Sequence, residues 1–161
     1  MTSVLRDSVR PIPFFDGARM MDGLKEEMLA ELSEVIDSGR FINGPQVAEF
    51  EASFATYCQT ATCVGVASGL DALRLALLAA GLERDDEVIV PAQTFVATFE
   101  AVTQAGGVPV VVDVTDSDYN IDPGAAEAAV TARTRFVLPV HLSGQMAALR
   151  AAGVELVGVV R

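Results

Sequence analysis

Apolar residues recur along the chain at two different spacings, and each spacing predicts one kind of element. Residues 1–20 contain Pro11 and Pro13 and are expected to be extended and irregular. From Asp22 to Gly39 the apolar residues follow helical spacing, and a second helix is expected after Pro45. Beyond residue 60, apolar runs predict strands at 62–67, 87–90, 108–112, 135–140 and 154–160, with helices between them at 70–80, 96–105, 124–132 and 145–152.

Nearly unbroken Val and Ile runs joined by helical crossovers are typical of a parallel sheet that is buried on both faces. We therefore expect an α/β fold, in which a mostly parallel sheet carries helices on both faces and two N-terminal helices precede it. Residues 1–60 would form the N-terminal segment and residues 61–161 the α/β domain. Ligands of such sheets bind beyond the carboxyl ends of the strands, which points to the loops at 68–71, 92–95, 113–120 and 141–145.

One of these loops combines a strand-to-helix turn with a glycine. Ser68 and Gly69 open a helical pattern that Gly81 closes. The unpaired N–H groups and the positive dipole end of such a helix favour an anion, and the Ser68 hydroxyl would add a donor. A plain turn explains the same residues. The glycine patterns of P-loops and of dinucleotide-binding folds are both absent.

Composition excludes several classes of function. The net charge of −11 and the pI near 4.3 argue against binding nucleic acid or an anionic membrane surface. Cys58, Cys63 and the single histidine, His141, supply too few ligands for a zinc site, and we expect two buried, reduced thiols. The N-terminus lacks a signal-peptide pattern, and no run reaches the ~18 apolar residues of a membrane span, so a cytoplasmic protein is expected.

Four segments that follow one another along the chain carry a specific resemblance. They are "GPQVAEFEASFATY", "VASGLDALRLALLAAGLERDDEVIVPAQTFVAT", "GGVPVVVDVTDSDYNID" and "TARTRFVLPVHLSGQ". The chain resembles the N-terminal part of the DegT/DnrJ/EryC1/StrS family of pyridoxal-phosphate sugar aminotransferases, which have aminotransferase fold type I. The resemblance implies a homodimer that moves an amino group from an amino acid, expected to be glutamate, to a nucleotide-linked keto-deoxysugar in amino-sugar biosynthesis.

The resemblance also assigns the cofactor loop. Ser68, Gly69, Leu70 and Asp71 match the family's phosphate loop, in which Leu70 replaces the usual threonine. Asp71 would repel a phosphate, so its carboxylate is expected to point away and to accept N–H groups of the first helical turn. Phe95, in "PAQTF", matches the aromatic residue that stacks on the cofactor ring.

Two further segments match the substrate side of the family's site. Asn43 and Gly44 belong to a loop near the active site, and a simple turn between helices explains them equally well. His141 and Gln145 follow the strand predicted at 135–140, where a structural role is the alternative for His141.

The resemblance supplies no catalytic residue. Lys25 is the only lysine in the sequence and lies in the predicted N-terminal helix, whereas the family's Schiff-base lysine lies C-terminal to all the matching segments. The residues Gly158 to Arg161 stand where the family's "EDAAQ" motif is expected. We therefore expect a partial cofactor-binding domain, truncated before the catalytic lysine. A truncated, inactive relative with at most a binding or interaction role is the alternative function.

Overall fold

The computed structural model describes residues 12–148. The predicted strand at 154–160 and the motif expected near 158–161 lie outside the described residues. The chain divides into two compact units, Met1–Gly65 and Val66–Arg161, and each is described by itself below. The domain boundary predicted at residue 60 stays a prediction.

The first unit is helical. Its helices are α1 (Gly17–Met20), α2 (Lys25–Ser38) and α3 (Pro45–Cys58). The short helix α1 lies in the segment that was expected to be irregular, where Asp16 accepts the N–H of Arg19 and caps it. The helix α2 ends at Gly39, whose φ of 66° suits a residue without a side chain. Both helices predicted in this part of the chain are confirmed.

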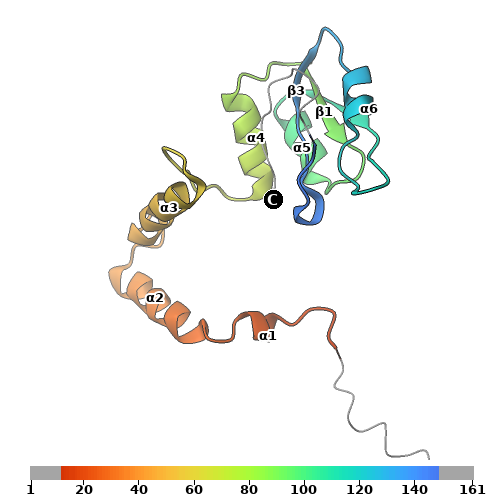
Figure 1. Cartoon of the computed structure of the whole chain (residues 1–161). Helices are drawn as coiled ribbons and strands as arrows, with labels where there is room; N and C mark the ends of the chain where they lie inside the picture. Colours follow the sequence, from red (N-terminus) through yellow and green to blue (C-terminus); the bar gives the residue numbers. More distant parts are fainter. Residues whose placement is uncertain (1–11, 149–161) are drawn as a thin grey trace, which may run out of the picture. The chain divides into compact units, whose positions relative to one another are not determined.

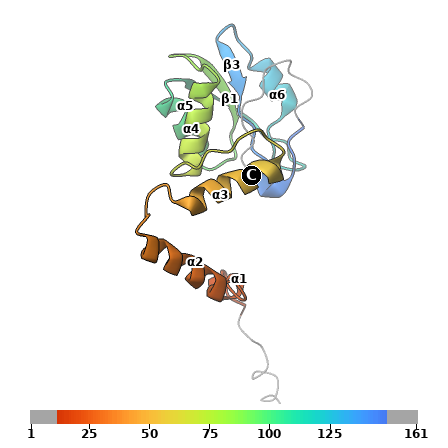
Figure 2. The ribbon, with the colours of Figure 1, turned by 90° about the vertical axis from the view of Figure 1, so that its left-hand side faces the viewer.

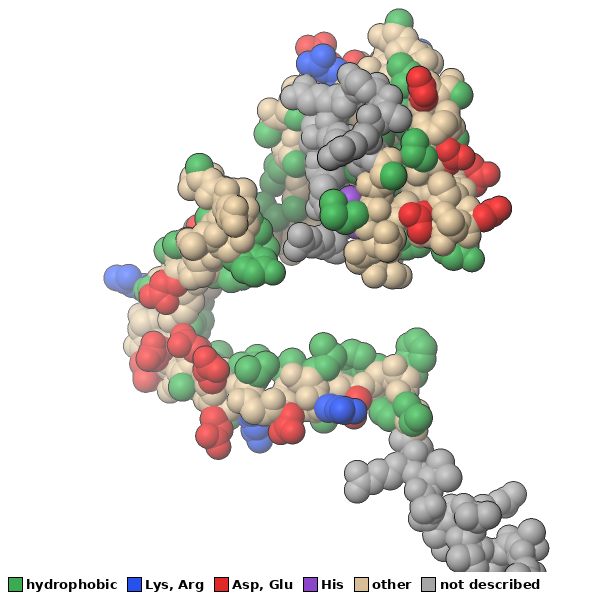
Figure 3. Space-filling view, viewed as in Figure 1, with side chains coloured by type: hydrophobic (Ala, Val, Ile, Leu, Met, Phe, Trp, Pro, Cys, Tyr) green, Lys and Arg blue, Asp and Glu red, His purple; other side chains and the backbone are tan. Residues whose placement is uncertain are grey.

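One side of α2 is apolar and exposed within this unit. Figure 3 shows hydrophobic side chains along one side of the helix and acidic ones along the other. Met28, Leu29 and Leu32 are each more than half exposed. The two cysteines are free but not buried as expected, since Cys58 is exposed and Cys63 only half-buried. None of the helices in residues 12–148 is long and apolar enough to cross a membrane.

The second unit is an α/β fold around a parallel sheet (Figure 1). Its elements along the chain are α4 (Gly69–Ala79), β1 (Glu87–Pro91), α5 (Ala97–Gln104), β2 (Val108–Val112), α6 (Pro123–Ala128), β3 (Thr134–Val137) and the 3₁₀ turn η1 (Leu142–Gly144). The strand order is β2-β1-β3, and both strand pairs are parallel. Every residue of the central strand β1 is buried, as its unbroken apolar run predicts.

Helices cover both faces of the sheet, as Figures 1 and 2 show. Val88 and Val90 of β1 face one core with side chains of α4 and α5, and Phe136 of β3 joins them. Ile89, which points to the opposite face, packs in a second core with Ala126 of α6. Successive side chains of β1 therefore pack into cores on opposite faces of the sheet. The predicted fold class is confirmed.

The strand predicted at 62–67 is wrong: these residues form no strand. Val64 and Val66 are exposed, at 74% and 41%. An apolar run becomes a strand only when a neighbouring strand accepts its hydrogen bonds, and no described strand pairs with this segment.

Other predicted elements are shorter than expected. The strand predicted at 135–140 is β3, which starts one residue earlier and ends at Val137, two residues before Pro139, which lacks an N–H to donate. The helix predicted at 124–132 ends at Ala128. Residues 145–148 form no helix, and the remainder of the helix predicted at 145–152 lies outside the described residues.

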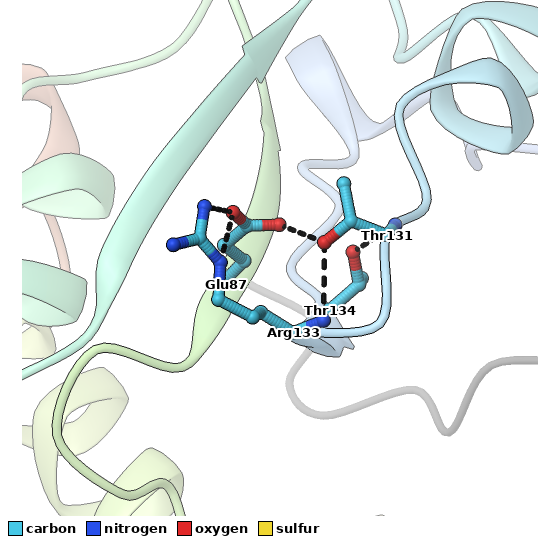
Figure 4. A network of polar contacts seen from close by, with 4 residues as sticks. All are labelled: Glu87, Thr131, Arg133 and Thr134. Carbon is cyan, nitrogen blue, oxygen red and sulfur yellow. Dashed lines mark hydrogen bonds and ion pairs between the residues drawn. The ribbon is translucent and has the colours of Figure 1, made fainter.

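A polar cluster joins the amino ends of two strands (Figure 4). The carboxylate of Glu87 accepts hydrogen bonds from the hydroxyl of Thr131 and from the guanidinium of Arg133, whose Nε lies 3.0 Å away. The Thr131 hydrogen bond, followed by the hydrogen bond and charge of Arg133, lowers the pKa of Glu87 although burial acts in the opposite direction. This cluster ties the end of β1 to the start of β3.

Candidate functional site

A pocket of about 590 Å³ opens at the carboxyl end of β1. Three segments line it, and they are the start of α4, the turn that leads into α5 and the chain after β3. These correspond to three of the four loops that the parallel topology had singled out. Most of its wall is apolar, with hydroxyl groups, one acid and one imidazole at intervals. Such a wall suits a small, largely apolar ligand that carries a few polar groups.

The first segment is the beginning of α4. The Ser68 Oγ accepts the N–H of Asp71 at 3.1 Å and so caps the helix, while the hydroxyl hydrogen of Ser68 stays available to another acceptor. Among the described residues, no acceptor meets the N–H groups of Gly69 and Leu70. A Cβ added at Gly69 would meet no atom within 4 Å, so the approach to this helix end is open. These groups together can hold an anion.

Asp71 does not behave as predicted. Its carboxylate accepts a hydrogen bond from Nη2 of Arg74, 2.9 Å away and one turn further along α4. The residue that caps the first turn is Ser68. A short acceptor at the N-cap position reaches the N–H three residues later, which leaves Asp71 free to pair with Arg74. The ion pair offsets the negative charge nearest the helix start.

The second segment contains an exposed aromatic ring and a pair of hydroxyls. Phe95 lines the pocket and is 77% exposed, although its neighbour Thr98 is buried. The hydroxyls of Thr94 and Thr98 are 2.8 Å apart and share a hydrogen bond. This bond links the turn before α5 to the first turn of that helix, and Phe95 lies in the segment that the bond spans. An exposed phenyl ring in a pocket can stack on a flat ligand.

The third segment presents His141. The ring is 8% exposed, lines the pocket, and accepts the N–H of Ala147 at Nδ1, 3.1 Å away. Because a backbone N–H can only donate, Nδ1 carries no proton, and in the neutral ring the proton is on Nε2. His141 therefore offers the pocket a hydrogen-bond donor, and Ser143 adds a hydroxyl nearby.

Sequence reasoning did not single out Asn120 as a site residue. This residue is 2% exposed, and its side chain hydrogen-bonds the backbone at both ends of the η1 turn, at Leu142 and at Gln145. The loop at 113–120 had been predicted to matter, but the partners lie more than twenty residues away in the sequence. A local pattern holds no signal for such a contact.

The remaining candidates have different places. Gln145 is exposed and does not line the pocket, and its backbone carbonyl is what Asn120 binds. Asn43 has a φ of 50°, and Gly44 precedes α3 where a Cβ would lie 2.8 Å from the Arg40 carbonyl oxygen. Both belong to the first unit, so their place near the site stays a prediction. No lysine lines the pocket within the described part of the chain.

The fold and the pocket define an α/β protein with a pocket at the carboxyl end of a parallel sheet, lined by an open helix start and an exposed aromatic ring. The profile of the DegT/DnrJ/EryC1/StrS aminotransferase family matches residues 22–153, and the chain belongs to this family. The resemblance read from the four ordered segments is thereby confirmed. Members of the family use pyridoxal phosphate or its amine form.

Individual relatives are similar in sequence and in structure. The dTDP-3-amino-3,4,6-trideoxy-alpha-D-glucose transaminase of Streptomyces venezuelae is 46% identical over 136 residues, which are 84% of this chain. The crystal structure of DesV from the same species, in complex with a ketimine intermediate, has a TM-score of 0.86 and 41% identity over 92% of this chain. NtdA of Bacillus subtilis, solved with bound PMP, has a TM-score of 0.82 and 39% identity over 88% of this chain.

The chain spans between one third and about two fifths of the length of these proteins. It covers 36% of the length of the transaminase, 42% of the DesV chain and 33% of the NtdA chain. The match therefore concerns the part of the fold described above. What the whole relatives act on is carried to this chain only as a proposal.

Proposed function

We propose that the pocket is the cofactor-binding part of a sugar aminotransferase site and takes pyridoxal 5′-phosphate or pyridoxamine 5′-phosphate. The single observation that supports this most directly is the open, capped start of α4 facing a pocket with an exposed aromatic ring. A phosphate and a flat ring are the two parts of this cofactor. The described residues fit both.

The phosphate would be bound by Ser68, Gly69 and Leu70. Two backbone N–H groups and the Ser68 hydroxyl are donors at the same helix end, and the helix dipole favours a negative charge there. Leu70 offers no hydroxyl, so the donors of this loop are the backbone N–H groups and the Ser68 hydroxyl. The N–H of Asp71 is already donated to Ser68, so Asp71 would affect the phosphate only through its carboxylate, which Arg74 neutralises.

The ring would lie against Phe95. The phenyl group excludes water from one face of a bound ring and limits its tilt. When bound, the cofactor serves as an electron sink for the transfer of an amino group. From the other wall, His141 would donate a hydrogen bond through Nε2 to an oxygen of the cofactor or the sugar, and Ser143 would offer its hydroxyl beside it.

Direct binding tests this proposal. Pyridoxamine 5′-phosphate is fluorescent and has no aldehyde, so its binding to the full 161-residue chain reports on the pocket rather than on reactive amines. We expect saturable binding that inorganic phosphate displaces and that Phe95→Ala weakens. Binding that phosphate leaves unchanged would contradict a phosphate site at α4.

The reaction proposed for the whole protein is amino transfer from an amino acid, with glutamate as the donor, to a nucleotide-linked keto-deoxysugar. The dTDP-sugar named in the S. venezuelae relative supports this substrate class. A cytoplasmic homodimer is proposed as the working form. Turnover with glutamate and a dTDP-keto sugar, set beside light scattering of the same sample, tests these points together. An amine product that does not depend on glutamate would exclude that donor.

A second candidate is a relative that binds the cofactor without catalysing transfer. The observation that favours it is that Lys25, on α2, is the only lysine in the 161 residues. Borohydride reduction in the presence of pyridoxal phosphate should then leave no pyridoxyl label at a defined site, and Lys25→Arg should bind pyridoxamine phosphate as the unmodified chain does. Specific labelling of Lys25 together with turnover would contradict this second candidate.

A further inference from the structure

Asn120 connects two segments that are distant in the sequence. The residue is 2% exposed and lies in the loop between β2 and α6. Oδ1 accepts the N–H of Leu142 at 3.1 Å, and Nδ2 donates to the carbonyl of Gln145 at 3.2 Å. Both ends of the amide are therefore used to hold the turn that follows β3.

The backbone between these two hydrogen bonds has an uncommon conformation. Ser143 has a φ of 53° and Gly144 a φ of 83°, both in the left-handed region. A residue with a side chain adopts this region at a cost and keeps it only where its surroundings hold it there. The Asn120 side chain forms hydrogen bonds with Leu142 and Gln145, the residues on either side of this pair. Ser143 itself lines the pocket.

Asn120 is itself held in place. Its N–H donates to Oδ1 of Asp118 at 3.1 Å, and its carbonyl accepts the N–H of Thr115 at 2.9 Å. Asp118 also accepts the hydroxyl of Thr115. An antiparallel bridge between Val114 and Ile121 closes the same loop. The loop that carries Asn120 is therefore held by its own hydrogen bonds, and these fix the position of the side-chain amide.

We propose that Asn120 is a positioning residue, which holds the 141–145 turn so that His141 and Ser143 face the ligand in the pocket. His141 enters this turn directly before Leu142, and its Nδ1 bond to Ala147 spans the turn. Loss of the two hydrogen bonds made by the Asn120 side-chain amide lets the turn change its backbone conformation. The side chains of His141 and Ser143 then move with it. The inference rests on the proposed cofactor site only for the identity of the ligand.

The test compares substitutions at Asn120 with a neighbouring control in the full chain. Asn120→Asp keeps an acceptor for Leu142 but loses the donor to Gln145, and Asn120→Ala loses both. Each hydrogen bond has a modest net contribution, so we expect pyridoxamine 5′-phosphate to bind about threefold to tenfold more weakly to Asn120→Asp, and more weakly still to Asn120→Ala. The control is Ile121→Val, a buried neighbour in the second core that makes no bond to the turn.

A general loss of stability would affect all three variants, whereas positioning affects only those at Asn120. Melting curves identify the Asn120 variant whose stability matches that of Ile121→Val, and Asn120→Asp serves if Asn120→Ala does not fold. Equal affinities in that matched pair would overturn the inference. Amide hydrogen exchange gives a readout without ligand: the N–H of Ala147 should lose protection in Asn120→Asp, in which Leu142 keeps its acceptor, and should keep its protection in Ile121→Val.

The two readouts separate this inference from the proposed function. If the unmodified chain binds no pyridoxamine phosphate, the proposed cofactor site fails, and hydrogen exchange alone then decides the role of Asn120 in holding the turn. Unchanged protection of the Ala147 N–H in Asn120→Asp would overturn it in either case.

Discussion

The hydroxyl oxygen of Ser68 accepts the backbone N–H of Asp71 at 3.1 Å, and this bond caps the helix that faces the pocket. The same serine therefore has a part in the stability of α4 and a proposed part in phosphate binding. The two roles use different atoms, because the cap uses a lone pair of the oxygen and the anion would use its hydrogen. Substitutions can separate them.

Ser68→Ala and Ser68→Gly both remove the hydroxyl. Alanine is a poor N-cap and should lower the free energy of unfolding by about 0.5–2 kcal/mol, whereas glycine should lower it by only a few tenths. Both variants should bind pyridoxamine phosphate more weakly than the unmodified chain, to a similar extent. Chemical denaturation and a binding titration measure the two effects. A full affinity in Ser68→Gly would show that the hydroxyl has no contact with the ligand.

The ion pair between Asp71 and Arg74 should tune the anion site. Arg74→Ala leaves the carboxylate of Asp71 without its partner near the phosphate, and we expect the affinity for pyridoxamine phosphate to fall about threefold to tenfold at low salt. The double variant Asp71→Asn with Arg74→Ala should recover most of the affinity.

Arg84→Ala is the matched control for this charge change. Arg84 follows α4 at the opposite end of the helix, and its side chain is 91% exposed. The substitution Arg84→Ala removes one positive charge, as Arg74→Ala does, but leaves the ion pair between Asp71 and Arg74 intact. An equal loss of affinity in this variant would mean that net charge, and not the local pair, sets the binding.

Phe95→Ala should weaken binding of the cofactor with little effect on stability. The ring is exposed in the free chain, so its removal leaves no cavity, but a bound ring would lose its stacking partner and about tenfold in affinity. Phe99→Ala is the contrasting variant, since Phe99 packs against the first core and its loss should lower the melting temperature. A large destabilisation of Phe95→Ala would contradict its proposed role at the pocket wall.

The cluster at Glu87 should make stability depend on pH. The hydrogen bond from Thr131 holds the pKa of Glu87 below its ordinary value of 4.5. A carboxyl with a lowered pKa in the folded state adds stability that is fully present above about pH 4.5 and is lost as the pH falls through the lowered pKa. The difference in unfolding free energy between the unmodified chain and Glu87→Gln should therefore be largest near neutral pH and shrink in acid.

Two further variants locate the cause of this pH dependence (Figure 4). Thr131→Val removes the largest contribution to the lowered pKa and should flatten the acid limb of the stability curve. Glu83→Gln is the control, because the side chain of this exposed glutamate makes no hydrogen bond within residues 12–148. A change in the acid limb of the Glu83 variant as large as that of Glu87→Gln would assign the effect to net charge.

What the sequence determined by itself is local. The serine before Gly69, the helical spacing of the leucines and Gly81 together predicted α4 and its free N–H groups, because capping and periodicity act within a few residues. The unbroken run at 87–90 predicted a strand buried on both faces for the same reason. From these elements the parallel topology and the end of the sheet that holds the pocket followed.

Only the tertiary structure decided which distant groups meet. The apolar run at 62–67 has the composition of a strand and is none, because pairing depends on a neighbour that the run does not contain. Asn120 reaches Leu142 and Gln145, and Glu87 reaches Arg133, across stretches of 22 to 46 residues. A hydrogen bond depends on the position of both partners to a few tenths of an ångström, and across such distances along the chain that position is set by the packing of the sheet and its helices.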